Sequence, residues 1–576
     1  MTGLTINCLP QVLALELALW CLVQAAVPSA GQTSSQTLLS RGQDAAVRGD
    51  WKAAEDLFQE AVHVDPRSAS SYAALGSAQL RLGKLGEAQK SFAEAIKLEP
   101  RQPLFRMRLA EIYLRQARLD AAAKEYNAVI NLDPGSFDAH YNLGRAYLIQ
   151  KSCKKALAQF GKAEELSSSH PEVAINIVDA HFCAGNEADA KVKAERVQRQ
   201  WWDSPQVLYS LGLVMFKNGS YESADRALAR AWELLPNETE IGMQVVRCKL
   251  ARRSFPEALT TLQTLRNSTA PTDKTEVLLG EAYSGLGDND SAIEAFRRAT
   301  RLNPRSASAH LALGRQLFES SDLDDALSHL REAHRLAPSD AAAAISLAQV
   351  MAKGGQFKEV IGLLESYAPD PSASPEVLSL LGVSYASLGR FSSAIPMLEV
   401  VTRRMPENDR ARFLLAFAHA ELGHGKEAVS AYEAAIRLNP RQALYYAHYA
   451  SLLERQGQLA AAEESLRKAL ALQPKSPVVH YGLGRILAQA GRYREAIEHL
   501  QNSIAAGQPP SRAYYLLATC YTRLGDASRA KEYRDKFAQM AAQEHREEYI
   551  NLSGDIEALS FGRSQFALPP SAGASP

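Results

Sequence analysis

Histidine is the residue type in this sequence whose spacing is easiest to test for chemistry, because imidazole binds transition metals and transfers protons near neutral pH. The chain of 576 residues contains 13 histidines. None of them forms an HExxH segment or another zinc-ligand spacing. His140, His310 and His480 recur at a constant interval (310 − 140 = 480 − 310), and equivalent residues so far apart in a regular array cannot meet at one metal ion. We therefore predict packing histidines and no metal site.

Other catalytic patterns are missing from the sequence as well. It contains no GxSxG nucleophile turn, no lysine-containing phosphate loop and no glycine-rich dinucleotide pattern after a strand. Lys+Arg 64 balance Asp+Glu 64, so the bulk charge does not favour nucleic acid as a partner. We predict no catalytic residues, no cofactor, no nucleic-acid partner and no small-molecule substrate.

The cysteines give a weaker signal. Two of the six lie in the apolar first segment, and the others show no CxxC spacing. Buried thiols are the simplest interpretation of the remaining four, Cys153, Cys183, Cys248 and Cys520. Cys153 and Cys183 both fall near predicted turns of adjacent helical units, so this is the pair to check for a disulfide if the protein is exported.

The elements that must position these residues repeat along the chain. The segments FAEAIKLEPRQ (92–102) and YEAAIRLNPRQ (432–442) are nearly alike, and their starts differ by ten times 34 (432 − 92 = 10 × 34). FRRATRLNPRS at 296–306 follows the first by six times 34 (296 − 92 = 6 × 34). Frames of 34 residues from Ser35 follow one another fifteen times without a gap and end at Glu544 (35 + 15 × 34 − 1 = 544). This period indicates an array of repeated two-helix units.

Four frame positions carry most of the pattern, and each has a physical reason. Positions 8 and 20 are small in nearly every frame, which lets two helices approach closely. Glycine is frequent at position 15, where it can adopt the left-handed conformation that ends a helix. Proline at position 32 cannot continue a helix and closes the unit. Each frame is predicted to contain a first helix (A), a turn at position 15 and a second helix (B).

This pattern resembles the tetratricopeptide repeat, which also has an aromatic residue or leucine at position 24, as in Phe58 and Tyr126. The resemblance implies an all-α fold, a right-handed α-solenoid (superhelix) of helix-turn-helix units whose A helices line an inner groove. Frames 171–204, 239–272 and 341–374 lack part of the pattern. There we expect the helix pairs to persist with an altered local twist.

The resemblance also implies which residues could bind a partner. Positions 2, 5, 9, 12 and 13 of the family face the groove, and here positions 5 and 9 place aromatic rings beside charged groups. Rings anchor and arginine recognises carboxylates or backbone carbonyls in protein interfaces. The alternative is that position-5 side chains pack against neighbouring A helices. The candidate binding residues are Tyr141, Arg145, Tyr209, Arg247, Arg315, Phe413, Tyr481, Arg485 and Tyr515.

Two specialised groove types of the family do not fit. Carboxylate clamps use Lys at position 5 with Asn at position 9, and no frame has that pair. Glycosyltransferase-type arrays carry an asparagine ladder at position 6, and here only Asn142 and Asn176 match it. The sequence therefore predicts neither a clamp for a C-terminal carboxylate nor a groove of the glycosyltransferase type.

A longer period lies inside the short one. HYNLGR (140–145), HLALGR (310–315) and HYGLGR (480–485) follow one another at intervals of five frames (310 − 140 = 480 − 310 = 5 × 34). One hypothesis is a block of five repeats copied to give 35–204, 205–374 and 375–544. The competing hypothesis is that the family consensus alone produces such matches.

The two ends differ from the repeats. Residues 1–30 are predicted to be a signal peptide or an N-terminal anchor, followed by a linker at 31–34, because 9–27 are mostly apolar and small residues follow. The absence of Lys or Arg before Arg41 and the presence of Glu16 leave three interpretations open: a cleaved signal, an anchor over 9–27, or a cytoplasmic protein with an N-terminal extension. After the array, we expect a polar capping helix at 545–560 and a disordered tail at 561–576.

These observations favour a non-enzymatic scaffold that binds protein or peptide segments along its groove. We expect it to be exported, with a membrane contact only through the N-terminal segment. Two alternatives stay open: an assembly component of a cell-envelope machine for secretion, polysaccharide export or pilus biogenesis, and a helper subunit of a glycosyltransferase.

Overall fold

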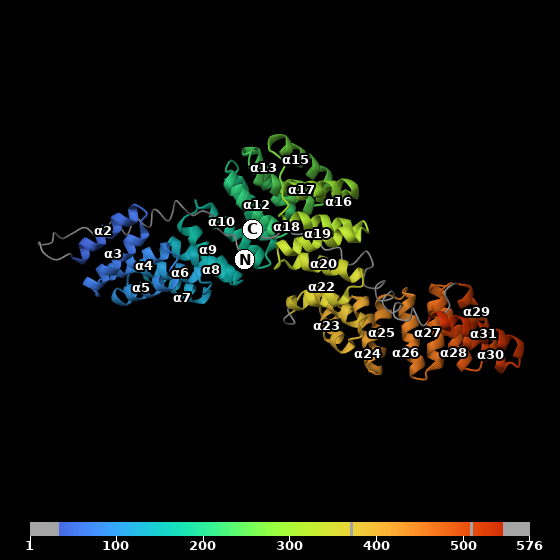
Figure 1. Ribbon diagram of the computed structural model, residues 1–576. Coiled ribbons are helices and arrows are strands. Elements are labelled where there is room, and N and C mark those ends of the chain that lie inside the picture. The colour runs from blue at the N-terminus through green and yellow to red at the C-terminus, as the bar shows by residue number, and fades with distance from the viewer. Residues whose placement is uncertain (1–33, 369–372, 507–510, 545–576) are drawn as a thin grey trace. The chain divides into compact units, whose positions relative to one another are not determined.

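The computed structural model describes residues 34–368, 373–506 and 511–544 (Figure 1). Over these residues the chain forms α-helices joined by short turns and no β-strand. The A helices are α2 (Ser35–Val47), α4 (Ala69–Arg81), α6 (Pro103–Arg115), α8 (Phe137–Ile149), α10 (Pro171–Cys183), α12 (Pro205–Lys217), α14 (Thr239–Ala251), α16 (Asp273–Leu286), α18 (Ala307–Glu319), α20 (Ala341–Lys353), α22 (Pro375–Ser387), α24 (Asp409–Glu421), α26 (Ala443–Arg455), α28 (Pro477–Gln489) and α30 (Ser511–Arg523). The B helices are α3 (Trp51–Val64), α5 (Leu85–Leu98), α7 (Leu119–Leu132), α9 (Cys153–Leu166), α11 (Glu187–Gln200), α13 (Tyr221–Leu234), α15 (Phe255–Ser268), α17 (Asn289–Leu302), α19 (Leu323–Leu336), α21 (Phe357–Leu364), α23 (Phe391–Arg404), α25 (Gly425–Leu438), α27 (Leu459–Leu472), α29 (Tyr493–Ala505) and α31 (Ala527–Glu544). The predicted all-α fold of helix-turn-helix units is confirmed.

Successive A helices keep the period of the sequence and begin one frame apart, as at Ser35, Ala69 and Pro103. A short polar side chain just before many of them sets this start. Ser136 accepts a hydrogen bond from the backbone N–H of Ala139 at 3.4 Å, and Ser476 accepts one from Val479 at 3.5 Å. Such N-caps satisfy a donor that the first helical turn leaves without a partner.

The turn between the helices of each unit has one residue with positive φ, always at frame position 15. Eleven of these residues are glycines, such as Gly491 with φ of 77°. The other four are Ala117, Lys151, Arg253 and Ser321. The turn geometry is therefore kept where glycine is absent, and a side chain there bears the steric cost of the left-handed conformation.

Small residues at positions 8 and 20 bring the two helices of a unit together. Ala156 and its position-20 equivalents in the other frames, including Val360, have no exposed surface. A Cβ added to Gly144 at position 8 would lie 2.6 Å from the ring of Phe160 at position 24. The ring of the B helix thus occupies the space that glycine leaves on the A helix.

The frame 341–374 shows what happens when the pattern weakens. Its helix pair persists, but α21 ends at Leu364 and continues as a 3₁₀ turn, Glu365–Tyr367. Pro369 follows in the sequence, and a proline pushes the preceding residue out of the helical conformation. The second helix is therefore shorter here than in the other frames.

The chain divides into two compact units, one ending at Pro271 and one beginning at Thr272. In each unit, a helix packs against the next helix along the chain and against the A helix of the following repeat. The core is correspondingly a series of clusters, each shared between neighbouring helix pairs.

No helix in the described ranges combines the length and apolar character needed to cross a bilayer. The predicted N-terminal segment 1–30 with its apolar stretch 9–27, the linker 31–34 apart from Ser34, the capping helix 545–560 and the tail 561–576 lie outside the described residues.

Candidate binding surface on the A helices

Two A helices carry the same pair of candidate side chains in the same arrangement. Tyr141 and Arg145 lie four residues apart on α8, and Tyr481 and Arg485 lie four residues apart on α28. Residues at this spacing share one face of a helix. In both pairs the guanidinium carbon lies 5.7 Å from the centre of the tyrosine ring, within the range of a cation–π contact. All four side chains are half-buried, so each pair presents a ring and a charge together.

The α8 pair is held by ring contacts of Tyr141 with Phe137 and the buried Phe160, and by polar groups of its own and the next A helix. The guanidinium of Arg145 donates to Oδ1 of Asn142 at 3.4 Å, and the amide of Asn176 on α10 donates to the Tyr141 hydroxyl at 3.3 Å. Asn142 itself donates to the carbonyl of Asp138 at 2.9 Å. This one long bond is the hydrogen bond that Arg145 makes among the residues that the structure describes, and it leaves most of the five N–H donors for a ligand.

The α28 pair is fixed by the preceding repeat. Arg485 forms an ion pair with Glu454 on α26, whose carboxylate also accepts from the amide of Gln489 at 2.9 Å. Burial raises the pKa of the Tyr481 hydroxyl, so it remains a hydrogen-bond donor at physiological pH. The α28 pair therefore has the same ring and cation as the α8 pair, but Glu454 already neutralises part of the Arg485 charge.

Tyr209 on α12 and Arg247 on α14 lie in consecutive repeats and are close enough to interact electrostatically. Burial, and then the nearby Glu240 carboxylate, raise the pKa of the half-buried Tyr209 hydroxyl, while Arg247 lowers it. The ring therefore faces charges of both signs. Within the described part of the chain, no hydrogen bond or ion pair holds the Arg247 guanidinium, so it is available to an anionic group.

Arg315 has the same intermediate exposure as Arg145 and Arg485, but its guanidinium is held by the next A helix. Its guanidinium donates to the Ser346 hydroxyl at 2.8 Å and to the Ala342 carbonyl at 3.4 Å, both on the next A helix. Burial lowers the pKa of Arg315, which is the signature of a cation removed from water. Arg315 therefore links α18 to α20, and its role in binding a partner stays a prediction.

Phe413 is buried and is therefore not a binding residue, which corrects its prediction. Only 1% of its side chain is exposed, and its ring stacks on Tyr445 with 4.8 Å between centroids. It also meets the edges of Tyr432 and His448. Position 5 packs inside the array at this residue, which was the alternative interpretation, because α25 and α26 both bring rings to Phe413 on α24.

Tyr515 on α30 is the most accessible of the candidate rings. It is 55% exposed and lies 5.6 Å from the Phe537 ring on α31, measured between centroids. An exposed ring supported by another ring can anchor an apolar side chain of a partner.

Sequence reasoning missed the ion pairs that join consecutive A helices. Lys217 lies 3.0 Å from Asp179, and Arg455 lies 3.1 Å from Glu421. Both pairs are separated by close to one repeat (217 − 179 = 38; 455 − 421 = 34), and this spacing of opposite charges was the available signal. These pairs neutralise part of the A-helix face and so reduce the number of charges available to a partner.

Comparison with protein families decides the class of this helix array. Tetratricopeptide repeat family models match residues 39–88, 73–137, 118–171, 277–341, 317–383, 385–452, 453–519 and 511–543. The chain is a tetratricopeptide repeat protein. None of these matches covers residues 172–276, the stretch that includes nearly all of two frames with an incomplete pattern. Tyr209 and Arg247 both lie in this stretch of the tetratricopeptide repeat array.

Comparisons with individual proteins add likenesses at low identity. No curated protein sequence matches this tetratricopeptide repeat chain. A chain of the APC/C hetero-tetramer Cut9–Hcn1 is 14% identical, with 79% of this chain and 96% of that chain covered and a TM-score of 0.38. A tetratricopeptide repeat protein from Parabacteroides merdae is 17% identical, covering 50% and 100%, with a TM-score of 0.32. MamA is 18% identical, covering 29% and 91%, with a TM-score of 0.28.

The cysteines of this tetratricopeptide repeat protein are only partly as predicted. Cys248 and Cys520 are buried free thiols, and burial raises the pKa of each. Cys153 and Cys183 instead form a disulfide between the start of α9 and the end of α10, with 5.5 Å between their Cα atoms. This bond joins the repeat at 137–170 to the repeat at 171–204, so the interpretation of these two as buried thiols was wrong.

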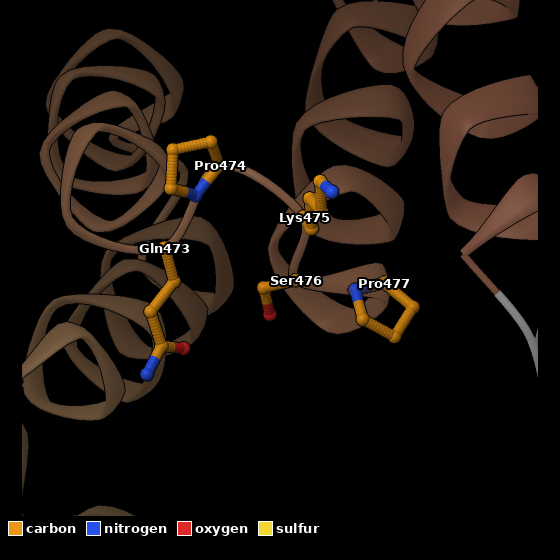
Figure 2. Close-up of a pocket in the computed structure, with 5 residues that line it drawn as sticks. All are labelled: Gln473, Pro474, Lys475, Ser476 and Pro477. Atoms are coloured by element: carbon orange, nitrogen blue, oxygen red, sulfur yellow. The ribbon is translucent and has the colours of Figure 1, made fainter.

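The described tetratricopeptide repeats show no other built site. No group of three or more His, Cys, Asp or Glu side chains in the described ranges is placed to hold a metal. Figure 2 shows residues 473–477, the connection between α27 and α28, which edge an open surface hollow. Among these five residues only Lys475 is charged and none is aromatic, so we assign no ligand to this hollow.

Proposed function

We propose that this protein is a non-enzymatic scaffold whose A-helix face binds protein segments rich in apolar and acidic residues. One observation carries the proposal: the tyrosine–arginine pairs of α8 and α28 have the same 5.7 Å geometry although ten frames separate them. Tyrosine and arginine dominate the binding energy of protein interfaces. The membership of the tetratricopeptide repeat family supports a protein-interaction role.

The chemistry of the pairs defines the partner. The ring offers a flat apolar surface, and the guanidinium offers several N–H donors in a fixed fork that matches a carboxylate. Arg145 and Arg247 keep more of these donors than Arg485 does, because Glu454 occupies Arg485. We therefore expect the tighter contacts in the unit that ends at Pro271.

Selection from a random peptide library on the immobilised full-length protein tests the proposal. We expect enrichment of peptides with Asp or Glu next to an aromatic or aliphatic residue, and loss of that enrichment in Tyr141→Ser/Arg145→Glu. Arg199→Glu on the B helix α11 makes the same charge change on an exposed side chain and serves as the matched control. Equal enrichment by all three proteins would overturn the proposal.

Crosslinking in the native host then separates two roles for the same surface. Recovery of many unrelated acidic segments indicates a general binder, and one stoichiometric complex indicates an assembly component.

We also propose that the protein is exported, supported by the Cys153–Cys183 disulfide, since disulfides persist mainly in oxidising compartments. Alkylation of protein isolated without reductant checks this: of the four cysteines in the repeats, only Cys248 and Cys520 should react after denaturation. Reaction of Cys153 and Cys183 as well would contradict export.

A further inference from the structure

The recurring histidines at frame position 4 form a second set of equivalent contacts. The ring nitrogen Nε2 lies 3.1 to 3.2 Å from the carbonyl oxygen of the proline six residues earlier, in the pairs His140–Pro134, His310–Pro304 and His480–Pro474. A carbonyl oxygen only accepts, so Nε2 carries a hydrogen and donates it. Nδ1 of each ring then faces the B helix of the same repeat.

Two of the repeats place a second histidine opposite Nδ1. Nδ1 of His310 lies 3.0 Å from Nδ1 of His329 on α19, and Nδ1 of His480 lies 3.1 Å from Nδ1 of His499 on α29. When both rings are neutral, the ring on the B helix donates its Nδ1–H to the lone pair of its partner. The pair also keeps this bond with one added proton, because a single hydrogen still lies between the two nitrogens. With two added protons, both Nδ1 atoms carry hydrogen and both rings are positive, so the contact becomes repulsive.

The equivalent position on α9 holds a glutamine. Oε1 of Gln159 lies 2.8 Å from Nδ1 of His140. A glutamine amide offers both an acceptor and a donor and can turn to present either one. It therefore satisfies His140 whether the ring is neutral or charged, and it adds no charge of its own.

We propose that the His310–His329 and His480–His499 contacts are acid-sensitive joints between the two helices of their repeats, and that the His140–Gln159 contact is an acid-tolerant version of the same joint. The proposal goes beyond scaffold binding, because it concerns how the array responds to its surroundings. It rests on the three equivalent geometries and on the residue opposite Nδ1 in each.

The charges around His329 agree with this assignment. Burial and then the neighbouring His310 lower the pKa of His329; Arg297 on α17 lowers it further, and Asp325 raises it. Glu332 on α19 also faces His310. The carboxylates do not reverse the net direction, so the closed joint disfavours the second proton.

The charges around His499 repeat this arrangement five frames later. Burial and then His480 lower the pKa of His499; Arg467 on α27 lowers it further, and Glu498 and Glu495 on α29 raise it. Because the open state titrates near the ordinary histidine pKa of 6.5, it takes up the second proton that the closed state resists. The joint is thus fully stable above that pH and loses stability as the pH falls through and below it.

The location of the joints gives them a consequence for binding. His480 immediately precedes Tyr481 on α28, whereas the acid-tolerant His140 immediately precedes Tyr141 on α8. If the proposed function is correct, acid should weaken binding at the α28 pair and spare the α8 pair. The joint itself is tested without any partner.

Hydrogen exchange of the full-length protein at about pH 7.5 and about pH 5 tests the proposal, with protection factors corrected for the intrinsic effect of pH. We expect α18, α19, α28 and α29 to lose about fivefold in protection at the lower pH relative to α8 and α9, the factor expected for one lost hydrogen bond. His329→Gln/His499→Gln should remove this loss. Gln159→His should create it in α8 and α9.

Each result is decisive in one direction. The same loss of protection in all three repeats, or a loss that persists in His329→Gln/His499→Gln, would overturn the proposal. His448 on α26 also titrates in the second unit, but it is present in every protein compared and cancels in the difference between variants. If Gln159→His does not fold, His329→Gln/His499→Gln alone still tests the proposal. That variant creates the histidine–glutamine contact that α8 and α9 already contain.

Discussion

The segments HYNLGR in α8 and HYGLGR in α28 are nearly identical and lie ten frames apart, yet their surroundings differ. Both present a tyrosine ring 5.7 Å from an arginine guanidinium carbon. Arg145 bonds only weakly within its own helix, whereas Arg485 is paired with Glu454 of the preceding repeat. His140 meets a glutamine and His480 meets a histidine.

The difference separates what one repeat determines from what its neighbours determine. The spacing of four residues on one helix sets the ring–cation contact, so it recurs wherever the segment recurs. The remaining bonds of the arginine depend on the residues of the next or preceding A helix. Copies of one motif can therefore differ in charge, in strength of binding and in response to pH.

The largest expected effect concerns position 5, which is half-buried in α8 and fully buried in α24. Phe413→Ala should destabilise its region by about 3–5 kcal/mol, because it leaves a cavity among three helices. Tyr141→Ala, at the same frame position, should cost much less because its ring is only half-buried. Local hydrogen exchange measures the loss of stability in both variants. Equal losses would contradict the distinction between a buried and a half-buried position 5.

The disulfide between α9 and α10 is the next largest difference, since Tyr493 and Arg523 stand at the equivalent positions ten frames later. Cys153→Ser should destabilise the repeats at 137–170 and 171–204 by about 2–4 kcal/mol. Urea unfolding with and without reductant checks this. The reductant should lower the stability of the native chain and leave the stability of Cys153→Ser unchanged.

Acid should act on the unit that begins at Thr272 more than on the other. Burial lowers the pKa of His448 to about 4 from an ordinary value of 6.5, and the equivalent residue ten frames earlier is Arg108. The unfolded chain binds this proton more readily, so stability is full above pH 6.5 and falls as the pH drops towards 4.

At pH 5 the loss from His448 should be about 2 kcal/mol. His448→Leu should abolish it in urea unfolding followed by hydrogen exchange of α26. An unchanged pH profile in that variant would show that His448 is not the group responsible.

A smaller effect tests the neighbour that distinguishes the two arginines. Glu454→Gln should cost about 1 kcal/mol, since the ion pair is partly exposed to solvent and screened. Asn142→Ala, which removes the weak partner of Arg145, should be close to neutral. Similar costs for the two substitutions would contradict the difference in how these arginines are held.

The sequence alone predicted features that depend on one repeat. The helix-pair architecture and the burial of position 20 follow from residue size and helix-ending chemistry, which the repeat period displays directly. It did not predict that Arg315 bonds to Ser346, that Phe413 is enclosed by Tyr432 and Tyr445, or that α21 is shortened. Those outcomes depend on the side chains that adjacent repeats contribute, and a frame position common to all repeats does not encode them.

The central claim is that the tyrosine–arginine pairs bind a partner, and calorimetric titration of a library-selected acidic peptide into full-length protein tests it most directly. Tyr141→Ala/Arg145→Ala should weaken binding by about tenfold or more, as expected for loss of interface anchors. Arg199→Ala on α11 should leave the dissociation constant unchanged. An unchanged dissociation constant in both Tyr141→Ala/Arg145→Ala and Tyr481→Ala/Arg485→Ala would contradict the claim.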